Sequence, residues 1–394
     1  MKRVVITGIG VVCGNAGNKE EFAQAVFFGK SGIKNCAVFD TNGLLTPYFG
    51  QADGIGDENR FYVLLKKSAE EMMTDAKISM EYFSSLGRKC RMFLGSLLYS
   101  SDAYYTHSKA KQERKECDSL AHMNDYSTYA KKITGVQGEV FISSAACASG
   151  TAAAGMALDF IRNGICDCAV VGGVDSLSII AAYGFNALKS LSRGVCNPYD
   201  MNRDGINLGE CGAFLFLESL EHALARSANI YCELTGYALG NDAYHITSPE
   251  PDGIGAYNTM LSAVNDAGIQ AGDIDYINGH GTGTQINDSM ETKATEKLIA
   301  GTDKKILLSS TKSMIGHCMG ASGVVELISV ILSMQYGKYI PLPNLKNTID
   351  DSDNIKMSDK TFDTDIEYSL SNSFAFAGNS ASVVVKKYHG GKAE

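Results

Sequence analysis

The stretch ISSAACASGTAAAGMALDFI, residues 142–161, decides the fold because it joins a strand to an apolar helix through small residues. Its β-branched start is typical of a strand, and the Ala- and Gly-rich run that follows predicts the helix. Residues 307–332, LLSSTKSMIGHCMGASGVVELISVIL, repeat this order in the second half of the chain. Since no low-complexity linker separates the halves, the repeat predicts two fused, similar lobes with a shared core. We place these lobes at residues 1–230 and 231–394.

Strand and helix patterns alternate along almost the whole chain. Strands are expected at residues 4–12, 91–98, 139–144, 167–173, 213–218, 232–239, 276–279, 305–310, 367–375 and 381–387. Helices are expected at residues 61–76, 124–134, 151–163, 256–267, 289–299 and 323–336. This alternation is typical of α/β proteins, and it favours largely parallel sheets covered by helices.

Charge, cysteine content and apolar runs exclude several classes of protein. The 394 residues include 35 Lys and Arg against 44 Asp and Glu, a net charge of −9 that disfavours nucleic-acid binding. Eleven cysteines without regular spacing are typical of reduced thiols, not of a disulfide framework. Residues 324–334 carry a charge and fall short of the roughly 20 residues of a membrane span. Residues 1–14 favour an opening strand over a signal peptide. We therefore expect a soluble cytoplasmic protein.

Glycine and cysteine spacings disfavour nucleotide and metal sites. Gly8 and Gly10 follow a strand, but Gly14 makes the pattern GxGxxxG where dinucleotide binding needs GxGxxG. Cys166 and Cys168 lack the second pair of thiols or imidazoles that a zinc site requires, so we interpret them as core thiols. We expect neither a metal nor a redox cofactor.

Cys147 is the strongest candidate for a nucleophile. It lies where the strand turns into the helix, between Ala146 and Ala148. A thiol at a helix N-terminus faces the positive end of the helix dipole, which predicts a pKa below the usual ~8.5. The unpaired N–H groups there are also suited to stabilising an oxyanion on a thioester carbonyl. A buried core cysteine is the alternative, and this segment alone does not decide between the two.

Two histidines lie in similar small-residue loops of the second half. His280 is in GHGTGTQINDSMETK, residues 279–293, and His317 follows Lys312 by five positions in STKSMIGHCMGASG, residues 310–323. Both loops run from a strand to a helix. Because the chain has only seven histidines, two in equivalent positions indicate a functional site more strongly than one structural histidine would.

Three carboxylate side chains lie in or near these loops, and we expect each of them to have a structural role. Glu326 is the sole charge in GVVELISVILSM, residues 323–334, which predicts a buried helix. A buried carboxylate needs a partner, and we expect Lys312 to supply it; contact with solvent at the helix edge is the alternative. Asp288 and Glu291 have the spacing of a capping box, so we expect them to cap the helix that follows.

Five motifs in this chain resemble those of the β-ketoacyl-acyl carrier protein synthases of the thiolase superfamily. They are SSAACASGT (143–151), NRDGINLGECGA (202–213), GHGTGT (279–284), STKSMIGHCMGASG (310–323) and NSFAFAGNSAS (372–382). The likeness covers essentially the whole chain and points to type II elongating enzymes and type II polyketide ketosynthases. It implies an α/β protein with the duplicated, five-layered αβαβα thiolase fold, usually as a dimer.

The resemblance implies a role for each matching residue. Cys147 would take the acyl chain from the phosphopantetheine thioester of its carrier, with the N–H groups of Cys147 and Phe376 as oxyanion hole. His280 and His317 would hold the malonyl thioester carbonyl while CO2 leaves. The other matches are Lys312 with Glu326 as the ion pair supporting the histidines, Thr282 and Thr284 as pantetheine contacts, and Phe376 as the gate over the nucleophile.

Three stretches depart from the family's pattern and leave the substrate open: residues 97–99, 102–137 and 375–378. The usual GFGG gate is Ala375-Phe376-Ala377-Gly378 here, so two glycines carry methyl groups. Leu97, Leu98 and Tyr99 stand where the family commonly has small residues beside the acyl pocket, and we expect Leu98 to contact the substrate.

The implied activity is an acyltransferase reaction, the decarboxylative Claisen condensation of an acyl chain on Cys147 with malonyl-acyl carrier protein. It would serve fatty-acid or type II polyketide or polyene synthesis, without a cofactor beyond the carrier's phosphopantetheine. The implied partners are an acyl carrier protein and either a second copy or a chain-length-factor-like homologue. The alternatives are such a non-catalytic subunit, which generally lacks the nucleophile, and a thiolase, with Cys318 as its second cysteine.

An acidic carrier protein needs a basic patch on this acidic chain. Lys66, Lys67, Arg162 and Arg203 are possible members of it.

Overall fold

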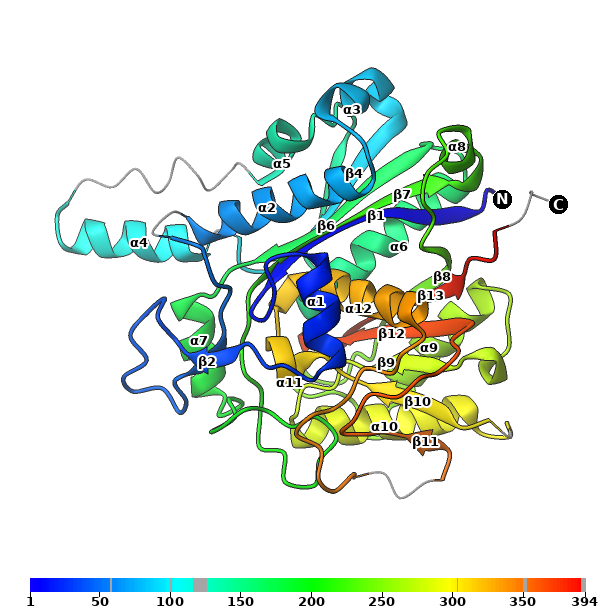
Figure 1. The fold of residues 1–394 in the computed structure, drawn as a ribbon. Helices are drawn as coiled ribbons and strands as arrows, with labels where there is room; N and C mark the ends of the chain where they lie inside the picture. Colours follow the sequence, from blue (N-terminus) through cyan, green and yellow to red (C-terminus); the bar gives the residue numbers. More distant parts are fainter. Residues whose placement is uncertain (57–58, 100, 116–125, 303, 350–352, 391–394) are drawn as a thin grey trace.

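The computed structural model describes residues 1–56, 59–99, 101–115, 126–302, 304–349 and 353–390, and in them one mixed sheet carries helices on both faces (Figure 1). The strand order is β11-β10-β9-β12-β13-β8-β1-β7-β6-β4-β5. The strands are β1 Val4–Cys13, β4 Cys90–Gly95, β5 Val140–Ser143, β6 Cys168–Asp175, β7 Cys211–Ser219, β8 Cys232–Asn241, β9 Tyr276–Asn278, β10 Ile306–Ser309, β11 Ile355–Lys356, β12 Tyr368–Phe374 and β13 Asn379–Lys387.

The remaining elements are a small sheet and the helices. The small sheet pairs β2 Ile33–Asn35 with β3 Tyr48–Gly50. The α-helices are α1 Lys19–Phe27, α2 Arg60–Asp75, α3 Met80–Leu86, α4 Ser101–Gln112, α5 Tyr126–Thr134, α6 Ser149–Arg162, α7 Ile179–Ala187, α8 Leu220–Ala225, α9 Ile254–Asp266, α10 Gln285–Ile299, α11 Lys312–Ile315 and α12 Ser322–Tyr336.

The two halves of the chain follow the same path. In the first half β1 pairs antiparallel with β7, β7 pairs antiparallel with β6, and β6 and β5 lie parallel to β4 on either side. In the second half β8, β13, β12, β9 and β10 repeat this order with the same directions. The half sheets join only where β1 meets β8, at Val5 with Glu233 and Ile6 with Cys232. The expected duplication is confirmed.

Helices and half sheets form five layers. Helices α2 and α5 cover the outer face of the first half sheet, and α9 and α10 cover that of the second (Figure 1). Helices α6 and α12 lie between the half sheets and contact strands of both. The central core, which draws apolar residues from both halves, surrounds these two helices. The layers are therefore αβαβα.

The two middle helices meet closely at their N-termini. A Cβ atom on Gly323, in the first turn of α12, would lie 2.4 Å from the backbone nitrogen of Thr151 in α6, so only glycine fits there. This close approach brings the turn before α6, which holds Cys147, next to the loop before α12, which holds His317.

The pattern-based elements are present, with ends shifted by at most about one helical turn. For the helix expected at 124–134, the first two residues lie outside the described residues and α5 accounts for the rest. The expectation of largely parallel sheets is wrong, because half of the neighbouring pairs in the large sheet are antiparallel. One cause is the short turn between β12 and β13, since such a connection requires antiparallel pairing.

One described helical stretch, Met319–Tyr336, has the length and hydropathy of a membrane span, and 89% of it is buried inside the fold. It contains α12, the middle-layer helix that packs against both half sheets. Its apolar character is therefore explained by the core.

Candidate active site

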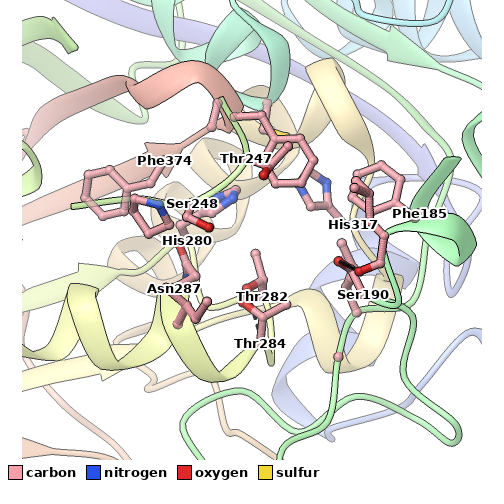
Figure 2. Close-up of a pocket in the computed structure, with 18 of the residues that line it drawn as sticks. Phe185, Ser190, Thr247, Ser248, His280, Thr282, Thr284, Asn287, His317 and Phe374 are labelled. Atoms are coloured by element: carbon pink, nitrogen blue, oxygen red, sulfur yellow. Dashed lines mark hydrogen bonds between the residues drawn. The ribbon is translucent and has the colours of Figure 1, made fainter. Parts of the chain in front are cut away.

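A cavity of about 510 Å³ opens where the loops before α6 and α12 meet (Figure 2). Cys147, His280 and His317 line it, and the thiol sulfur and one ring nitrogen of each histidine lie within 4.8 Å of one another. The lining also includes Thr282 and Thr284, which are hydrogen-bonded to each other at 2.9 Å. The structure thus gathers into one site residues that the sequence placed in separate loops.

Cys147 lies at the tightest point of the turn between β5 and α6. Residues Ala146–Ala148 form a 3₁₀ turn, and Ala146 has a φ of 51°, a left-handed conformation that costs a non-glycine residue about 1–2 kcal/mol. Met319 has a φ of 52° in the corresponding turn before α12. Gly320 follows it there, so only the first of the two repeats has a cysteine at this position.

Burial dominates the protonation of the Cys147 thiol, which is 7% exposed. Removal from water raises its pKa to about 12, although the nearby Lys312 ammonium acts in the opposite direction. The predicted low pKa is therefore wrong, because the sequence revealed the helix N-terminus but not the depth of the thiol. The thiol is therefore protonated at neutral pH, and any reaction of its sulfur as a nucleophile requires loss of that proton.

A pH series tests this protonation state. We expect the rate of Cys147 alkylation by iodoacetamide to rise about tenfold per pH unit between roughly pH 7 and 9, because the thiolate fraction grows with pH below the pKa. Mass spectrometry of the peptide containing Cys147 measures the rate at that one thiol. A plateau within this range would contradict the raised pKa.

His317 is fixed in one tautomer by its own loop. The backbone N–H of Met319 donates to His317 Nδ1 at 2.9 Å, and Ser322 Oγ lies 3.1 Å from the same nitrogen. Because Nδ1 accepts, the ring proton of the neutral imidazole is on Nε2. Burial and the Lys312 charge hold the pKa of His317 well below its usual value, so the ring stays neutral.

His280 is fixed in the same tautomer by a different partner. Lys312 Nζ, which can only donate, lies 3.4 Å from His280 Nδ1 and 2.5 Å from the His280 carbonyl oxygen. Burial, with Lys312 and His317 as secondary causes, holds the pKa of His280 well below its usual value. The two rings lie 5.3 Å apart, nearly perpendicular to each other. The site therefore offers two neutral Nε2–H donors.

A thiol and two imidazoles at such short distances also resemble a metal-binding set. A metal would need the lone pair of each imidazole on the cavity side, where both rings carry their proton. The hydrogen bonds from Met319 and Lys312 therefore disfavour a metal, and the donor pair suits a ligand oxygen with negative charge.

Lys312 and Glu326 form an ion pair behind the histidines, and both side chains are only 1% exposed. The expected pairing is confirmed, and solvent contact at the helix edge is excluded. Lys312 Nζ also donates to the His280 carbonyl, so this one cation orients the carboxylate, the His280 backbone and the His280 ring.

Asp288 and Glu291 hold the loop of His280 instead of capping α10. Glu291 accepts hydrogen bonds from the N–H groups of His280 at 2.6 Å and Gly281 at 2.8 Å, and Asp288 accepts from that of Thr282 at 3.0 Å. Helix α10 begins three residues before Asp288, so the capping prediction is wrong. The loop folds back over the first turns of the helix, a tertiary contact that spacing does not reveal.

Phe376 covers the mouth of the cavity. It is 37% exposed, and its ring stacks on Phe185 of α7 with 5.6 Å between centroids. The next residue, Ala377, has a φ of 61°, in the left-handed region that glycine adopts without strain. The loop therefore carries strain that a glycine at this position would not.

Replacing Ala377 tests that strain. We expect Ala377→Gly to raise the free energy of unfolding by about 0.5 kcal/mol, because the relief of the left-handed strain exceeds the entropy gained by the unfolded chain. Ala375→Gly is the matched control, since Ala375 is extended with a φ of −121° and should lose about 0.5–1 kcal/mol. Denaturant unfolding measures both, and a loss in both variants would contradict the strain.

Leu98 does not line the cavity. It is half-buried and packs against an apolar cluster that contains Met319, together with Leu97 and Phe185. Phe185 belongs to both this cluster and the cavity wall. The predicted direct substrate contact of Leu98 is therefore absent from the described cavity, and Leu98 supports the wall from behind.

The suggested basic patch is wrong for its two arginines. Arg162 is buried and pairs with Asp266, and Arg203 is buried and donates to the carbonyl oxygen of Gln285 at 2.7 Å. Lys66 and Lys67 are exposed on α2 but do not line the cavity. The sequence shows where cations occur, not which of them are buried.

Several residues of the cavity were not predicted. Lys189 is exposed and lines the cavity, and apolar side chains surround the same opening: Phe185, Leu188, Ile206, Ile286 and Phe374. They come from loops and helix ends far apart in the sequence and share no spacing. No pattern in the sequence marks them.

The chain matches known proteins over nearly its full length. Residues 1–223 match the family model "Beta-ketoacyl synthase, N-terminal domain", and residues 231–346 match "Beta-ketoacyl synthase, C-terminal domain". The 3-oxoacyl-[acyl-carrier-protein] synthase 2 of Staphylococcus aureus (strain COL) is 32% identical, over 98% of this chain and 99% of its own.

Solved structures with the same fold include two assemblies that contain a ketosynthase. A chain of AntDE:AntF, a type II PKS acyl-carrier protein in complex with its ketosynthase, is 27% identical, with a TM-score of 0.89 over 98% of this chain and 100% of its own. A chain of the ishigamide ketosynthase/chain length factor is 29% identical, with a TM-score of 0.89 and the same coverage.

Proposed function

The chain belongs to the β-ketoacyl synthase family, and we propose that Cys147, His280 and His317 carry out the family's reaction in this cavity. As a 3-oxoacyl-acyl carrier protein synthase, the protein condenses an acyl chain with a malonyl unit, in fatty-acid or type II polyketide synthesis. The residue roles rest on one observation, the pair of neutral Nε2–H donors beside a single buried thiol.

Acyl transfer is the first step. Cys147 Sγ attacks the carbonyl carbon of the acyl-carrier thioester, a new C–S bond forms, and the bond to the pantetheine sulfur breaks. The proton that leaves Cys147 is balanced by the one that the departing pantetheine thiol takes up. We assign the oxyanion of this step to the backbone N–H groups of Cys147 and Phe376, and the pantetheine arm to Thr282 and Thr284.

Decarboxylation uses the two imidazoles. The malonyl thioester oxygen accepts hydrogen bonds from His280 and His317 Nε2, and CO2 leaves with its C–C bond electrons passing into an enolate. Two neutral donors stabilise the enolate oxygen without first protonating it. The enolate carbon then attacks the acyl-Cys147 carbonyl, and the cysteine sulfur leaves as a thiolate that takes a proton from solvent.

Lys312 is buried behind the histidines, and a buried charge needs a partner of opposite charge. The Lys312 charge is close to both rings and lowers their pKa values, and Glu326 balances that charge at the same depth. We assign Lys312 and Glu326 to positioning roles, because Lys312 is hydrogen-bonded to His280 and neither side chain lines the described cavity.

The partners follow from the surface around the cavity. AntDE:AntF contains an acyl carrier protein bound to its ketosynthase, and we infer that a carrier protein docks at the mouth of this cavity. Lys189 is the exposed cation among the described lining residues, and we propose it for the docking patch in place of the buried Arg162 and Arg203. It is placed to meet the pantetheine phosphate or an acidic side chain of the carrier.

A second chain is inferred from strand β5. Among the described residues this strand ends the large sheet and pairs with β4 alone, and its Ile142 is 43% exposed. An open strand edge with an apolar side chain suits pairing with another chain. The partner is a second copy or a chain-length-factor-like homologue, as in the ishigamide ketosynthase/chain length factor.

We further propose a cytoplasmic location, supported by the unpaired cysteines of the described residues. The comparisons do not favour the two alternatives. Cys147 and both histidines are retained, which disfavours an inactive subunit, and Cys318 is buried with its sulfur toward the Ile315 carbonyl, 3.9 Å away, and not toward the cavity.

Intact mass spectrometry tests the proposed roles. The purified chain is incubated with an acyl-carrier thioester and malonyl-carrier protein, and we expect acylated Cys147 followed by a β-ketoacyl-carrier product. Acylation without condensation would show that a partner subunit is missing. Absence of acylation with every carrier tried would contradict the nucleophile.

A further inference from the structure

Asp175 is a buried carboxylate that the reaction above does not use. It is the last residue of β6 and is fully buried. Its oxygens accept hydrogen bonds from Ser96 Oγ at 2.7 Å and from the N–H groups of Leu97 at 3.0 Å, Leu98 at 2.7 Å and Gly320 at 2.7 Å. Burial raises the pKa of Asp175 to about 6, and these hydrogen bonds act against the rise, so the carboxylate is ionised at neutral pH.

The four donors belong to two loops with different tasks. Leu97 and Leu98 follow β4 and pack against the same apolar cluster as Phe185, a residue of the cavity wall. Gly320 belongs to the loop of His317, directly after Met319, whose N–H sets the His317 tautomer. Asp175 therefore ties the residues behind the cavity wall to the loop that orients a catalytic imidazole.

The two loops touch through their backbones at this point. A Cβ atom on Gly320 would lie 2.7 Å from the backbone nitrogen of Leu97, so no side chain could separate them. The carboxylate is thus the group that holds adjacent N–H groups of both loops in register. A shift of either loop would change the other.

The four hydrogen bonds to Asp175 require a side chain whose two oxygens both accept, which a carboxylate provides. Every partner of Asp175 donates, so both carboxylate oxygens must accept. An asparagine would turn an NH2 group toward at least one N–H group and leave that donor buried without a partner. A carboxylate of another length would keep the accepting character.

We propose that Asp175 is a positioning residue. It fixes Leu97 and Leu98, which pack against the same apolar cluster as Phe185 of the cavity wall, relative to His317, and thereby selects the length of acyl chain that reaches Cys147. The proposal rests on the proposed function for the nature of the chain. The selection itself concerns access to a thiol and is measurable without condensation.

Alkyl-chain probes measure that access. Cys147 is alkylated with N-alkyl iodoacetamides of short or long alkyl chain, and intact mass gives the ratio of the two rates. We expect Asp175→Asn to change this ratio by about tenfold, because small displacements of a reacting geometry have effects of this order. Asp175→Glu keeps an accepting carboxylate and should return the ratio toward that of the unmodified protein.

Two further variants complete the test. Ser96→Ala removes one of the four donors to Asp175. We expect it to change the ratio of alkylation rates in the same direction as Asp175→Asn but by less. This variant also tests the proposal if Asp175→Asn does not fold. Asp275→Asn is the matched control, since Asp275 accepts from the N–H groups of Glu367 and Tyr368 at the start of β12 and lines no part of the described cavity. It should leave the ratio unchanged.

The outcomes separate the two proposals. Unchanged ratios in folded Asp175→Asn and Ser96→Ala variants would overturn the positioning role, whatever the condensing activity. A chain that selects probes by length through Asp175 but forms no β-ketoacyl product would contradict the proposed function and leave the positioning role in place.

Discussion

Replacing Cys147 by alanine is expected to abolish acylation and to lower condensation by at least about 10³-fold, because no other described thiol lines the cavity. Decarboxylation of malonyl-carrier protein should persist in this variant. In the proposed reaction His280 and His317 hold the enolate oxygen, and their hydrogen bonds to Met319 and Lys312 do not involve the cysteine. The Cys147→Ala variant should therefore release CO2 without forming the β-ketoacyl product.

Cys318→Ala is the matched control for this experiment. Cys318 follows His317 directly in sequence, yet its sulfur faces the core and lies within 4 Å of the carbonyl oxygens of Ile315 and Gly316. We expect it to keep acylation and condensation. Full β-ketoacyl product from Cys147→Ala, or loss of acylation in Cys318→Ala alone, would contradict the assignment of the nucleophile.

Replacing Lys312 by methionine should have the largest effect on stability. Removing one partner of a buried ion pair leaves the other charge uncompensated, which costs about 3–5 kcal/mol. Glu326 is 1% exposed, and its Oε2 has no hydrogen-bond partner within the described residues, so little remains there to satisfy the charge. Denaturant unfolding at fixed protein concentration measures the loss.

A double variant separates stability from catalysis. Lys312→Met combined with Glu326→Leu removes both charges, and we expect it to regain most of the stability because a buried ion pair is often replaceable by apolar residues. It should not regain condensing activity, since His280 Nδ1 still lacks its donor. Recovery of activity along with stability would contradict the positioning of His280 by Lys312.

The fold was largely predictable because its long elements carry strong local patterns. The strand before Cys147 and the apolar helix after it, and the matching pair before and after His317, marked the duplication directly. Short elements such as β11 and α11 carry no such pattern, and tertiary contacts define them. Strand direction was not predictable in full, because periodicity does not distinguish a crossover from a hairpin.

The site was predictable where a reactive side chain and its surrounding small residues lie in one continuous loop. Cys147, His280 and His317 stand in small-residue turns, and the charge of Glu326 in an apolar helix pointed to Lys312. Burial was the part that the sequence did not reveal. The thiol pKa and the positions of Arg162 and Arg203 depend on how deep a side chain lies once both halves have packed.

The open edge of β5 has a consequence for handling the protein. In the part of the chain that the structure describes, no strand pairs with the outer edge of β5. Such an edge beside an exposed isoleucine is a template for nonspecific strand addition when the proper neighbour is missing. If that neighbour is a different chain, expression of this one alone will favour aggregates, and co-expression will yield soluble material. Ile142→Lys places a charge on this strand. It should reduce aggregation of the chain expressed alone, and it should also block pairing with the natural partner. The yield of soluble protein, with and without co-expression, therefore indicates whether that partner is a different chain.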